Sequence, residues 1–269
     1  MNDFILDNTM LSDFDTCPTR YYWRHIRSLV LVDDNRAPLD FGTAMHSALE
    51  AFYQSGDMKS AFTAFVLAMK NAATDDTRSL ENGIKILYEY FEKWNPEPFQ
   101  VVQVETAIQW ELSRDLIFCG KIDLIIKWNN QIHIVDHKTS AQINNFCPKP
   151  NHQFTGYIFG AKVLGHNPVG AMINLVAVLS PNTKIPLMDR FHRVLTTRTE
   201  FELNDWKHHV LSVQQRIIQA IDSNYFEKCT TQCTWCPYKK LCTSSPETIE
   251  QVIPMYYHEM KWHPWEIEK

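Results

Sequence analysis

Two strand-like segments joined by two asparagines place the strongest constraint on how this chain folds. Residues 115–128 and 131–140 are rich in β-branched and aromatic side chains, and the two-residue connection Asn129-Asn130 is typical of a β-hairpin. Apolar residues on both faces of the second strand, including Ile134 and Val135, indicate that this strand is buried on both sides. The hairpin is therefore predicted to lie in the protein core.

This buried strand carries two charged residues, Asp136 and Lys138. Residues i and i+2 of a strand share a face, so the two side chains are predicted to project together. Because an unpaired buried charge is costly, one interpretation is a plain buried ion pair. The other interpretation includes Asp123 on the neighbouring strand. Two carboxylates beside one ammonium group suit metal-assisted phosphodiester hydrolysis: carboxylate oxygens bind Mg²⁺, and the lysine stabilises an attacking water or the developing negative charge.

The remaining sequence predicts an α/β protein with additional helices at both ends. We expect one domain over residues 1–269, with helices to about residue 98, a core to about 225 and a cysteine-rich segment at about 226–245. The periodicity of apolar residues assigns the individual elements. Helices are predicted at 9–30, with Ser12 as the candidate cap, and at 41–55, 57–73, 77–94, 152–164 and 199–223; further strands are predicted at 99–109, 169–180 and 186–196.

Composition excludes several classes of protein. Hydrophobic residues make up 45% of the chain and charged residues 21%, which excludes a disordered or low-complexity chain. The net charge of −5 gives no overall nucleic-acid footprint, so any contact with DNA must use a local basic patch. The N-terminal segment lacks the features of a signal peptide, and no apolar run approaches the roughly 20 residues that span a bilayer. We therefore expect a cytoplasmic protein without membrane contact.

The seven cysteines are unevenly distributed along the chain. Cys229, Cys233, Cys236 and Cys242 lie within one short segment. The odd number of cysteines and the expected compartment both disfavour a disulfide framework, so this segment indicates a metal or iron–sulfur site. These four thiols alone would satisfy a zinc ion.

Four short motifs follow one another along the chain. GTAMHSALE (42–50) has a G-x-x-x-H pattern that contains His46, and GKID (120–123) and VDHKT (135–139) lie on the two strands of the hairpin. The segment from Gln153 to Tyr157 has a Q-x-x-x-Y pattern, in which residues i and i+4 of a helix point together toward the sheet. In this order, the motifs make the chain resemble the RecB-like branch of the PD-(D/E)xK nucleases.

The resemblance implies both a fold and a set of site residues. The implied fold is a restriction-endonuclease-like mixed central sheet flanked by helices. The implied cofactor is Mg²⁺ or Mn²⁺, with Lys138 activating or orienting water and with Gln153 and Tyr157 positioning the strand. The implied metal ligands are His46, Asp123, Asp136 and the backbone carbonyl of His137, and the implied catalytic residues are Asp123, Asp136, Lys138, Gln153 and Tyr157.

One position departs from the family pattern. His137 stands between Asp136 and Lys138, where many PD-(D/E)xK enzymes have an acidic residue, and the resemblance implies that His46 supplies the missing ligand. Glu105 is a loose match to a glutamate on the strand before GKID. Outside the family pattern, His46 would be interpreted as an ordinary, partly buried histidine.

The resemblance implies a metal-dependent DNA nuclease, specifically an exonuclease of single-stranded DNA or DNA ends in repair, recombination or phage or CRISPR DNA processing. The sequence contains no G-x-x-x-x-G-K-[ST] motif, so unwinding would need a helicase partner. The alternatives are a non-catalytic nucleic-acid-binding module and a subunit of a larger recombination complex. The intact Asp123, Asp136 and Lys138 favour the enzyme.

The cysteines extend the resemblance to the iron–sulfur members of this branch. Cys233, Cys236 and Cys242 have the C-x2-C-x5-C spacing of those proteins. The segment DTCPTRYYWRHI resembles their N-terminal CPxRYY motif, in which Cys17 is the cysteine. These four residues are therefore the implied ligands of a 4Fe–4S cluster that closes the C-terminal segment onto Cys17. Zinc held with Cys229 in place of Cys17 is the alternative.

A local basic patch accompanies the cysteines. Its candidate nucleic-acid-binding residues are Arg20, Arg24, Arg27, Lys239 and Lys240, interleaved with Tyr21, Tyr22 and Trp23. Cationic and aromatic side chains suit single-stranded DNA through phosphate contact and base stacking. The alternative is a solvated helix face above a stripe of core aromatic residues.

Overall fold

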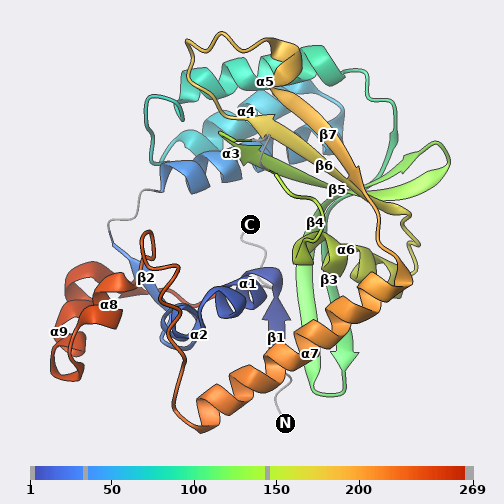
Figure 1. Cartoon of the computed structure of the whole chain (residues 1–269). Coiled ribbons are helices and arrows are strands. Elements are labelled where there is room, and N and C mark those ends of the chain that lie inside the picture. The colour runs from blue at the N-terminus through green and yellow to red at the C-terminus, as the bar shows by residue number, and fades with distance from the viewer. Residues whose placement is uncertain (1–3, 33–35, 143–145, 264–269) are drawn as a thin grey trace. The chain divides into compact units, whose positions relative to one another are not determined.

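The computed structural model of the chain describes residues 4–32, 36–142 and 146–263, which form two compact units (Figure 1). The terminal unit contains residues 1–34, 109–120 and 200–269, and the sheet unit contains residues 35–108 and 121–199. Strands β3 (Gln100–Ser113) and β4 (Leu116–Trp128) contribute residues to both units.

The strands of the sheet unit form a mixed sheet in which β4, β5, β6 and β7 follow one another. β4 and β5 are antiparallel, and Asn129 and Asn130 between them have left-handed φ angles of 49° and 61°. Such angles at both central residues match the twist of a two-residue hairpin. β5 and β6 are parallel, whereas β6 and β7 are antiparallel. The bounds are Gln131–Ser140 for β5, Gly170–Ala177 for β6 and Phe191–Thr196 for β7.

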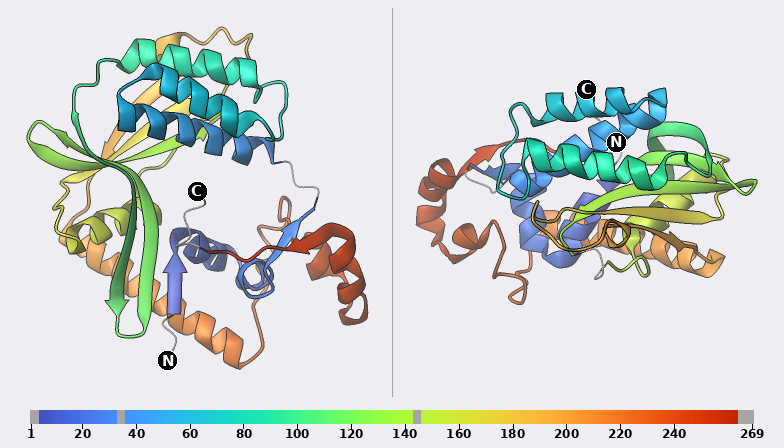
Figure 2. Two further views of the ribbon diagram at one scale, coloured as in Figure 1. Left: turned by 180° about the vertical axis from the view of Figure 1, so that it is seen from behind. Right: turned by 90° about the horizontal axis from the view of Figure 1, so that it is seen from above.

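Three helices cover one face of this sheet (Figures 1 and 2). They are α3 (Ala37–Ser55), α4 (Met58–Met69) and α5 (Leu80–Trp94). Local signals fix their ends: Asp57 caps α4, Ser79 caps α5, and Gly56, with a φ of 72°, ends α3.

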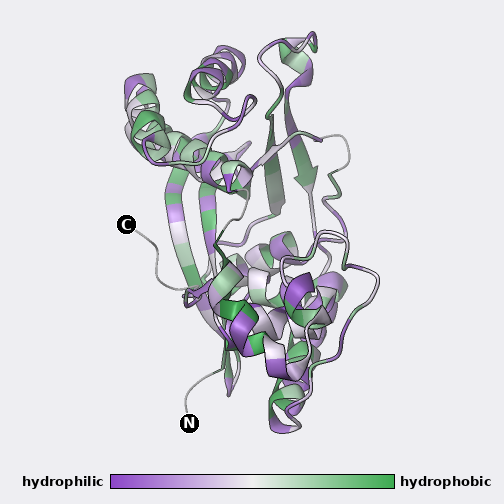
Figure 3. Ribbon diagram, turned by 90° about the vertical axis from the view of Figure 1, so that its left-hand side faces the viewer, coloured by the Kyte–Doolittle hydropathy of each residue, from purple (hydrophilic) through white to green (hydrophobic). Residues whose placement is uncertain are grey.

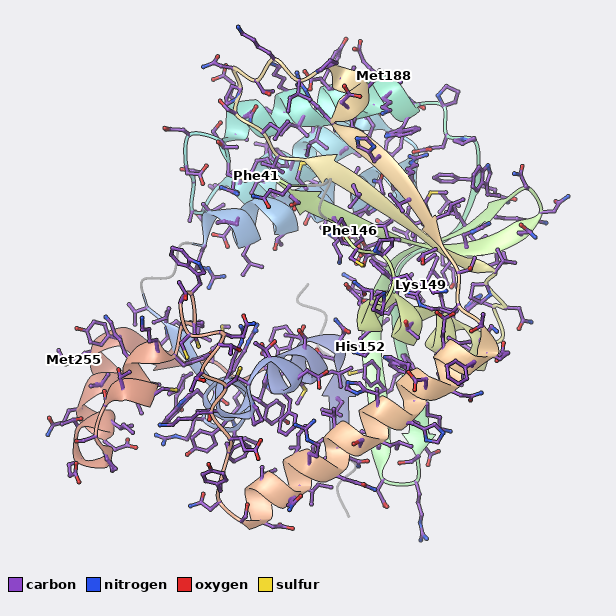
Figure 4. The ribbon with its side chains drawn as sticks, viewed as in Figure 1. Phe41, Phe146, Lys149, His152, Met188 and Met255 are labelled. Atoms are coloured by element: carbon purple, nitrogen blue, oxygen red, sulfur yellow. The ribbon has the colours of Figure 1, made fainter. Side chains whose placement is uncertain are left out.

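The apolar sides of these helices pack against the sheet to form the main core. Phe41 of α3 is 1% exposed and points into this core (Figure 4). In Figure 3 the strands carry long hydrophobic stretches, whereas the helices alternate between hydrophobic and hydrophilic residues. This pattern is expected for a sheet covered on its faces by amphipathic helices.

Helix α6 (His152–Val163) connects β5 to β6 and contacts the opposite face of the sheet. Val135 belongs to the core under α3 to α5, and the alternation of side chains along β5 turns Asp136 the other way. There Asp136 contacts Gln153 of α6. The side chain of Asn151 caps this helix at the Phe154 N–H.

The terminal unit combines segments from the two ends of the chain. β1 (Phe4–Asp7) pairs in parallel with the start of β4, and β2 (Leu29–Leu31) pairs with β8 (Tyr257–Glu259) in antiparallel orientation. The remaining helices are α7 (Glu200–Asp222), α8 (Lys239–Thr243) and α9 (Pro246–Tyr256), near whose end the exposed Met255 is labelled in Figure 4. A small core contains Trp23, Leu29, Tyr238, Leu241 and Tyr257.

The prediction of a single helix over residues 9–30 is wrong. α1 (Asn8–Thr16) ends at Cys17, whose backbone is extended (φ −168°, ψ 114°), and α2 (Pro18–Tyr21) then leads into a π-helical turn (Tyr22–Ile26). Proline disfavours the helical conformation in the residue before it, so Pro18 accounts for the break.

The predicted cap of this helix is also wrong. Asp7, rather than Ser12, caps α1, because its side chain accepts a hydrogen bond of 2.7 Å from the Met10 N–H. The predicted central hairpin, the three helices before it and the long helix after β7 are confirmed, with ends shifted by a few residues. The strand predicted at 186–196 begins only at Phe191, after a 3-10 turn at Leu187–Asp189. Among the helices of the described residues, none combines the length and the hydropathy needed to cross a bilayer.

Candidate active site

Two buried carboxylates lie at the same level of neighbouring strands in the sheet unit. Leu124 of β4 pairs with Val135 of β5, and Asp123 and Asp136 are the residues immediately beyond this last pair on the two strands. Asp123 is 7% exposed and Asp136 is 3% exposed. Two carboxylates buried this closely require compensating charges and hydrogen-bond donors.

The negative charge of Asp123 is compensated by a backbone N–H group and by a side chain of α3. Its Oδ2 accepts a hydrogen bond of 2.6 Å from the backbone N–H of His137 and lies 3.4 Å from Nδ1 of His46. Although burial alone raises the pKa of Asp123, His46 and His137 lower it below its ordinary value. In turn, Asp123 overcomes the opposing effect of burial and raises the pKa of His46.

Glu105 of β3 completes a group of three possible metal ligands. One ligand atom from each of His46, Glu105 and Asp123 lies within 4.8 Å of the others. Glu105 has a φ of 50°, and this left-handed conformation is strained for a residue with a side chain. Its carboxylate pairs with the Lys121 ammonium group, and burial raises its pKa. Glu105, which matches the family pattern only loosely, therefore lies at the site.

Asp136 has different partners from Asp123. Its Oδ2 lies 2.8 Å from Lys138 Nζ, and its Oδ1 accepts a hydrogen bond of 3.3 Å from Gln153 Nε2. Gln153 also donates to the Tyr157 hydroxyl at 3.1 Å. Burial raises the pKa of Asp136, and the nearby Asp123 adds to this effect while Lys138 opposes it. The structure therefore brings together all the predicted catalytic residues.

Close contact between α3 and β5 makes this arrangement possible. A Cβ atom at Gly42 would lie 3.3 Å from Thr139 Oγ1, so only glycine lets the helix approach the strand this closely without displacing Thr139. Gly42 belongs to the same motif as His46, and Thr139 to the same motif as Asp136. The glycine of the G-x-x-x-H pattern thus has a packing role.

A row of buried polar residues behind the site was not predicted from the sequence. His137 is opposite Asn174 on β6, and Asn174 is opposite Arg193 on β7. His137 Nδ1 lies 2.8 Å from Asn174 Nδ2, and the His137 ring stacks on Tyr53 with centroids 5.7 Å apart. Burial lowers the pKa of His137 to about 3, which keeps the imidazole neutral at physiological pH.

The row ends in a buried ion pair. Arg193 donates to the two carboxylate oxygens of Glu97 at 2.7 and 2.6 Å, and its guanidinium lies 4.0 Å from the centroid of the Trp94 ring. The side chains of Arg193 and Glu97 are each 10% exposed. No spacing signal in the sequence connects these residues, because they come from different elements.

In the terminal unit, five cysteines line one pocket. Cys17, at the break after α1, accepts a hydrogen bond of 3.3 Å from the Cys229 N–H on its Sγ atom, and Cys233 Sγ lies 3.3 Å from the Cys229 carbonyl oxygen. Among the residues that the structure describes, no three cysteine sulfurs lie within 4.8 Å of one another. The hydrogen bond from Cys229 places Cys17 close to the C-terminal segment. The cysteines that line the pocket are Cys17, Cys229, Cys233, Cys236 and Cys242.

The predicted basic patch is largely occupied by contacts within the terminal unit. Arg20 and Arg24 contact the buried Asp13 carboxylate at 2.7 and 3.0 Å. Arg27 pairs with Glu250 at 3.1 Å, and Lys240 Nζ lies 3.3 Å from the centroid of the Tyr256 ring. The interleaved aromatic residues include buried core residues, since Tyr21 is 2% and Trp23 is 7% exposed. Trp235, by contrast, is 94% exposed.

Comparison with known families identifies the class of protein. The model of the PD-(D/E)XK nuclease superfamily matches residues 8–243 of this sequence. The chain therefore belongs to the PD-(D/E)XK nuclease superfamily. No curated protein shows significant sequence similarity to the chain.

Solved structures support the fold. The chain superposes on a candidate exonuclease from Eubacterium rectale with a TM-score of 0.52 and 14% identity, over 92% of both chains. The predicted fold, a restriction-endonuclease-like mixed sheet between helices, is thereby confirmed. The alkaline exonuclease LHK-Exo from Laribacter hongkongensis gives a TM-score of 0.37 at 9% identity, over 69% of this chain and 95% of that one. A phage-related exonuclease from Haemophilus somnus gives a TM-score of 0.35 at 14% identity, over 65% of this chain and 94% of that one.

The buried Arg193–Glu97 pair gives a prediction about stability. We expect Arg193→Met to lower the free energy of unfolding by about 3 kcal/mol, because Glu97 would be left as an uncompensated buried charge. Urea denaturation monitored by circular dichroism measures this change. Arg36→Met, which removes an exposed pair with Asp40, is the control and should cost less than about 1 kcal/mol. Equal losses in the two variants would contradict the prediction.

Proposed function

We propose that the chain is a divalent-metal-dependent deoxyribonuclease that hydrolyses phosphodiester bonds of single-stranded DNA or DNA ends as an exonuclease. The observation that carries this proposal is the buried pair Asp123 and Asp136, with Lys138 beside one carboxylate and His46 beside the other. A merely structural ion pair would need neither the second carboxylate nor the nearby imidazole. The match to a candidate exonuclease over most of both chains supports the exonuclease assignment.

The residues at the site fit a hard divalent cation. Carboxylate oxygens and a neutral imidazole are suitable ligands, and His46, Glu105 and Asp123 offer one ligand atom each within 4.8 Å. We assign His46, Asp123, Asp136 and the backbone carbonyl of His137 as the Mg²⁺ or Mn²⁺ ligands, with Glu105 as an additional candidate. When bound, the cation supplies positive charge that stabilises the negative charge developing on the phosphate.

The other side chains of the site handle water and the DNA strand. Lys138 Nζ, 2.8 Å from Asp136, carries a positive charge that can orient an attacking water and stabilise the developing charge. Gln153 and Tyr157 on α6 are hydrogen-bonded to one another and lie beside Asp136, where they would position the strand. Because the family match from residue 8 to 243 includes segments of both units, we propose that both belong to one nuclease domain. A helicase or recombination partner would supply unwinding.

We further propose that Cys17, Cys233, Cys236 and Cys242 hold a 4Fe–4S cluster. Support comes from the common pocket of about 210 Å³ that these residues line. The cluster would join the N-terminal break at Cys17 to the C-terminal segment.

The cysteine segment also offers contacts to a DNA strand. Lys239 lines the cysteine pocket, Lys240 is exposed beside Tyr256, and Trp235 presents nearly its whole side chain to solvent. Exposed cationic and aromatic side chains suit single-stranded DNA. We therefore assign the strand contact mainly to Lys239 and Lys240, with Trp235 as a stacking residue. Arg20, Arg24 and Arg27 contribute positive charge through their ion-paired guanidinium groups.

Substitutions in the core test the catalytic assignment. We expect Asp136→Asn and Lys138→Ala to lower kcat by at least about 10³-fold, because each removes a charge that acts on the reacting phosphate or water. The measurement is digestion of 5′- and 3′-labelled single-stranded DNA with Mg²⁺ or Mn²⁺, with Lys127→Ala on β4 as the control. A Lys138→Ala variant that cleaves DNA at the wild-type rate would refute the assignment.

His46 gives a separate test of the metal site. We expect His46→Ala to raise the Mn²⁺ concentration for half-maximal activity by at least about tenfold, since one ligand is lost. Because Asp123 raises the pKa of His46, protons should compete with the metal at a higher pH than for an ordinary histidine, and activity should fall as the pH is lowered through that pKa. Metal titrations at several pH values measure both effects. If the His46→Ala variant shows unchanged metal dependence, His46 is not a metal ligand and has a structural role.

Single serine substitutions distinguish an iron–sulfur cluster from zinc. Protein purified without oxygen is expected to be brown and to contain about four irons per chain. Cys17→Ser and Cys233→Ser should both remove the colour, whereas Cys229→Ser should leave it almost unchanged. Metal analysis and visible absorption measure these outcomes. A colourless zinc protein that tolerates Cys17→Ser but not Cys229→Ser would contradict the cluster.

A further inference from the structure

Arg198 lies just after β7, and its guanidinium group contacts the start of α6, whose first residue, His152, is labelled in Figure 4. Its Nε donates a hydrogen bond of 2.8 Å to Thr155 Oγ1, and its Nη2 donates one of 2.8 Å to the carbonyl oxygen of Pro148. Its Nη1 donates to Thr196 Oγ1 at 2.6 Å. One planar guanidinium group thus joins the end of β7 to the segment before α6 and to the first turn of that helix.

The hydroxyl group of Thr155 fixes the direction of these hydrogen bonds. It donates its only proton to the Asn151 carbonyl oxygen at 2.8 Å, so toward Arg198 Nε its oxygen is an acceptor. Arg198 Nη2 also lies 3.5 Å from the same Asn151 oxygen. The junction therefore needs several N–H donors in one plane, which arginine provides and which a positive charge alone does not.

The contact with Thr155 holds α6 on the side away from its predicted site residues. Successive residues of an α-helix are about 100° apart, so Thr155 lies about 200° from both Gln153 and Tyr157 around the helix. On the other side, Gln153 donates to Asp136 at 3.3 Å and to Tyr157 at 3.1 Å. The position of the first turn therefore sets the distance between Gln153 and Asp136.

The helix does not depend on Arg198 for its formation. Its apolar residues Phe154, Ile158 and Ala161 are at most 1% exposed, and their burial holds the helix against the sheet. The Arg198 contacts involve only the first turn and the segment before it, where a helix lacks internal hydrogen bonds for its N–H groups. Arg198 thus acts on where the helix begins.

We propose that Arg198 is a positioning residue of the nuclease site, which holds the first turn of α6 so that Gln153 lies beside Asp136 before the DNA strand binds. This inference rests on the proposed nuclease function, in which Gln153 positions the strand. Arg198 acts through α6 and needs no contact with the DNA. Such positioning matters because a displacement of about 1 Å at a reacting site can lower the rate about 100-fold.

The first test follows the helix and requires no activity. We expect Arg198→Met to speed hydrogen–deuterium exchange of the Thr155 amide by at least about tenfold, because the first turn opens more often. Exchange measured by NMR detects this change. Arg190→Met, which removes contacts with Glu89 and the Ile185 carbonyl oxygen, is the matched control and should leave the Thr155 amide unchanged. Equal exchange in the wild-type protein and in Arg198→Met would overturn the inference.

The second test is a double-mutant cycle on the reaction. We expect Arg198→Met to lower kcat/KM on a labelled single-stranded oligonucleotide with Mn²⁺ by at least about tenfold. When Gln153 is already replaced by alanine, the same substitution should lower kcat/KM by less than about twofold, because the side chain that Arg198 positions is absent. A full loss in both backgrounds would refute the inference, since Arg198 would then act independently of Gln153.

Arg198→Lys separates positioning from charge. Lysine keeps the positive charge but cannot serve Thr155, Thr196 and Pro148 from one plane, so this variant should be as slow as Arg198→Met. A lysine variant with the wild-type kcat/KM, beside a slow methionine variant, would show that Arg198 acts through its charge and would refute the positioning role.

The outcomes distinguish this inference from the proposed function. If Lys138→Ala is inactive while Arg198→Met and Arg190→Met both cleave at the wild-type rate, the nuclease assignment holds and the role of Arg198 is refuted. An inactive wild-type protein would refute both. Thermal unfolding of each variant shows that it is folded.

Discussion

The burial of two carboxylates at the same level of β4 and β5 is the constraint on which the rest of the sheet unit depends. Each carboxylate would be costly to bury without compensation, and the two repel one another. The surrounding contacts offset this cost: His46 and the His137 N–H on Asp123, and Lys138 and Gln153 on Asp136. The tight turn at Asn129-Asn130 sets the register of the two strands, and a slip of one residue would leave the two carboxylates on opposite faces of the sheet.

The surroundings of the two carboxylates shift their pKa values in opposite directions. Asp123, with a lowered pKa, stays ionised across the physiological range, whereas burial and its neighbour raise the pKa of Asp136. A cation bound between them would favour the ionised form of both and would remove their repulsion. The strained backbone at Glu105 belongs to the same arrangement, since it holds a third carboxylate near His46 and Asp123. The strain and the charge repulsion are therefore concentrated at one place in the fold.

The sequence predicted the parts of this site that have local signals. The hairpin, the strand with Asp136 and Lys138, and the helices with His46 and Gln153 follow from periodicity and short motifs. The row from His137 through Asn174 to Arg193 could not be predicted, because its members meet only through the pairing of three strands. Cys17 shows a different limit: apolar spacing favoured one long helix, but the steric effect of Pro18 ended it there. That break gives Cys17 the extended backbone with which it meets Cys229.

The terminal unit shows why a cluster of basic residues along a helix is a weak indicator of nucleic-acid binding. Arg20 and Arg24 have the spacing of a basic face, but Asp13 of the preceding helix α1 is 3% exposed and pairs with both. Removing these arginines would leave the buried Asp13 carboxylate with only His25 as a side-chain partner, so their first role is to stabilise the unit. The cysteine segment differs, since Lys239, Lys240 and Trp235 are exposed to solvent there. Under the proposed cluster, the same four thiolates would thus set both the fold of this segment and the position of its strand-binding side chains.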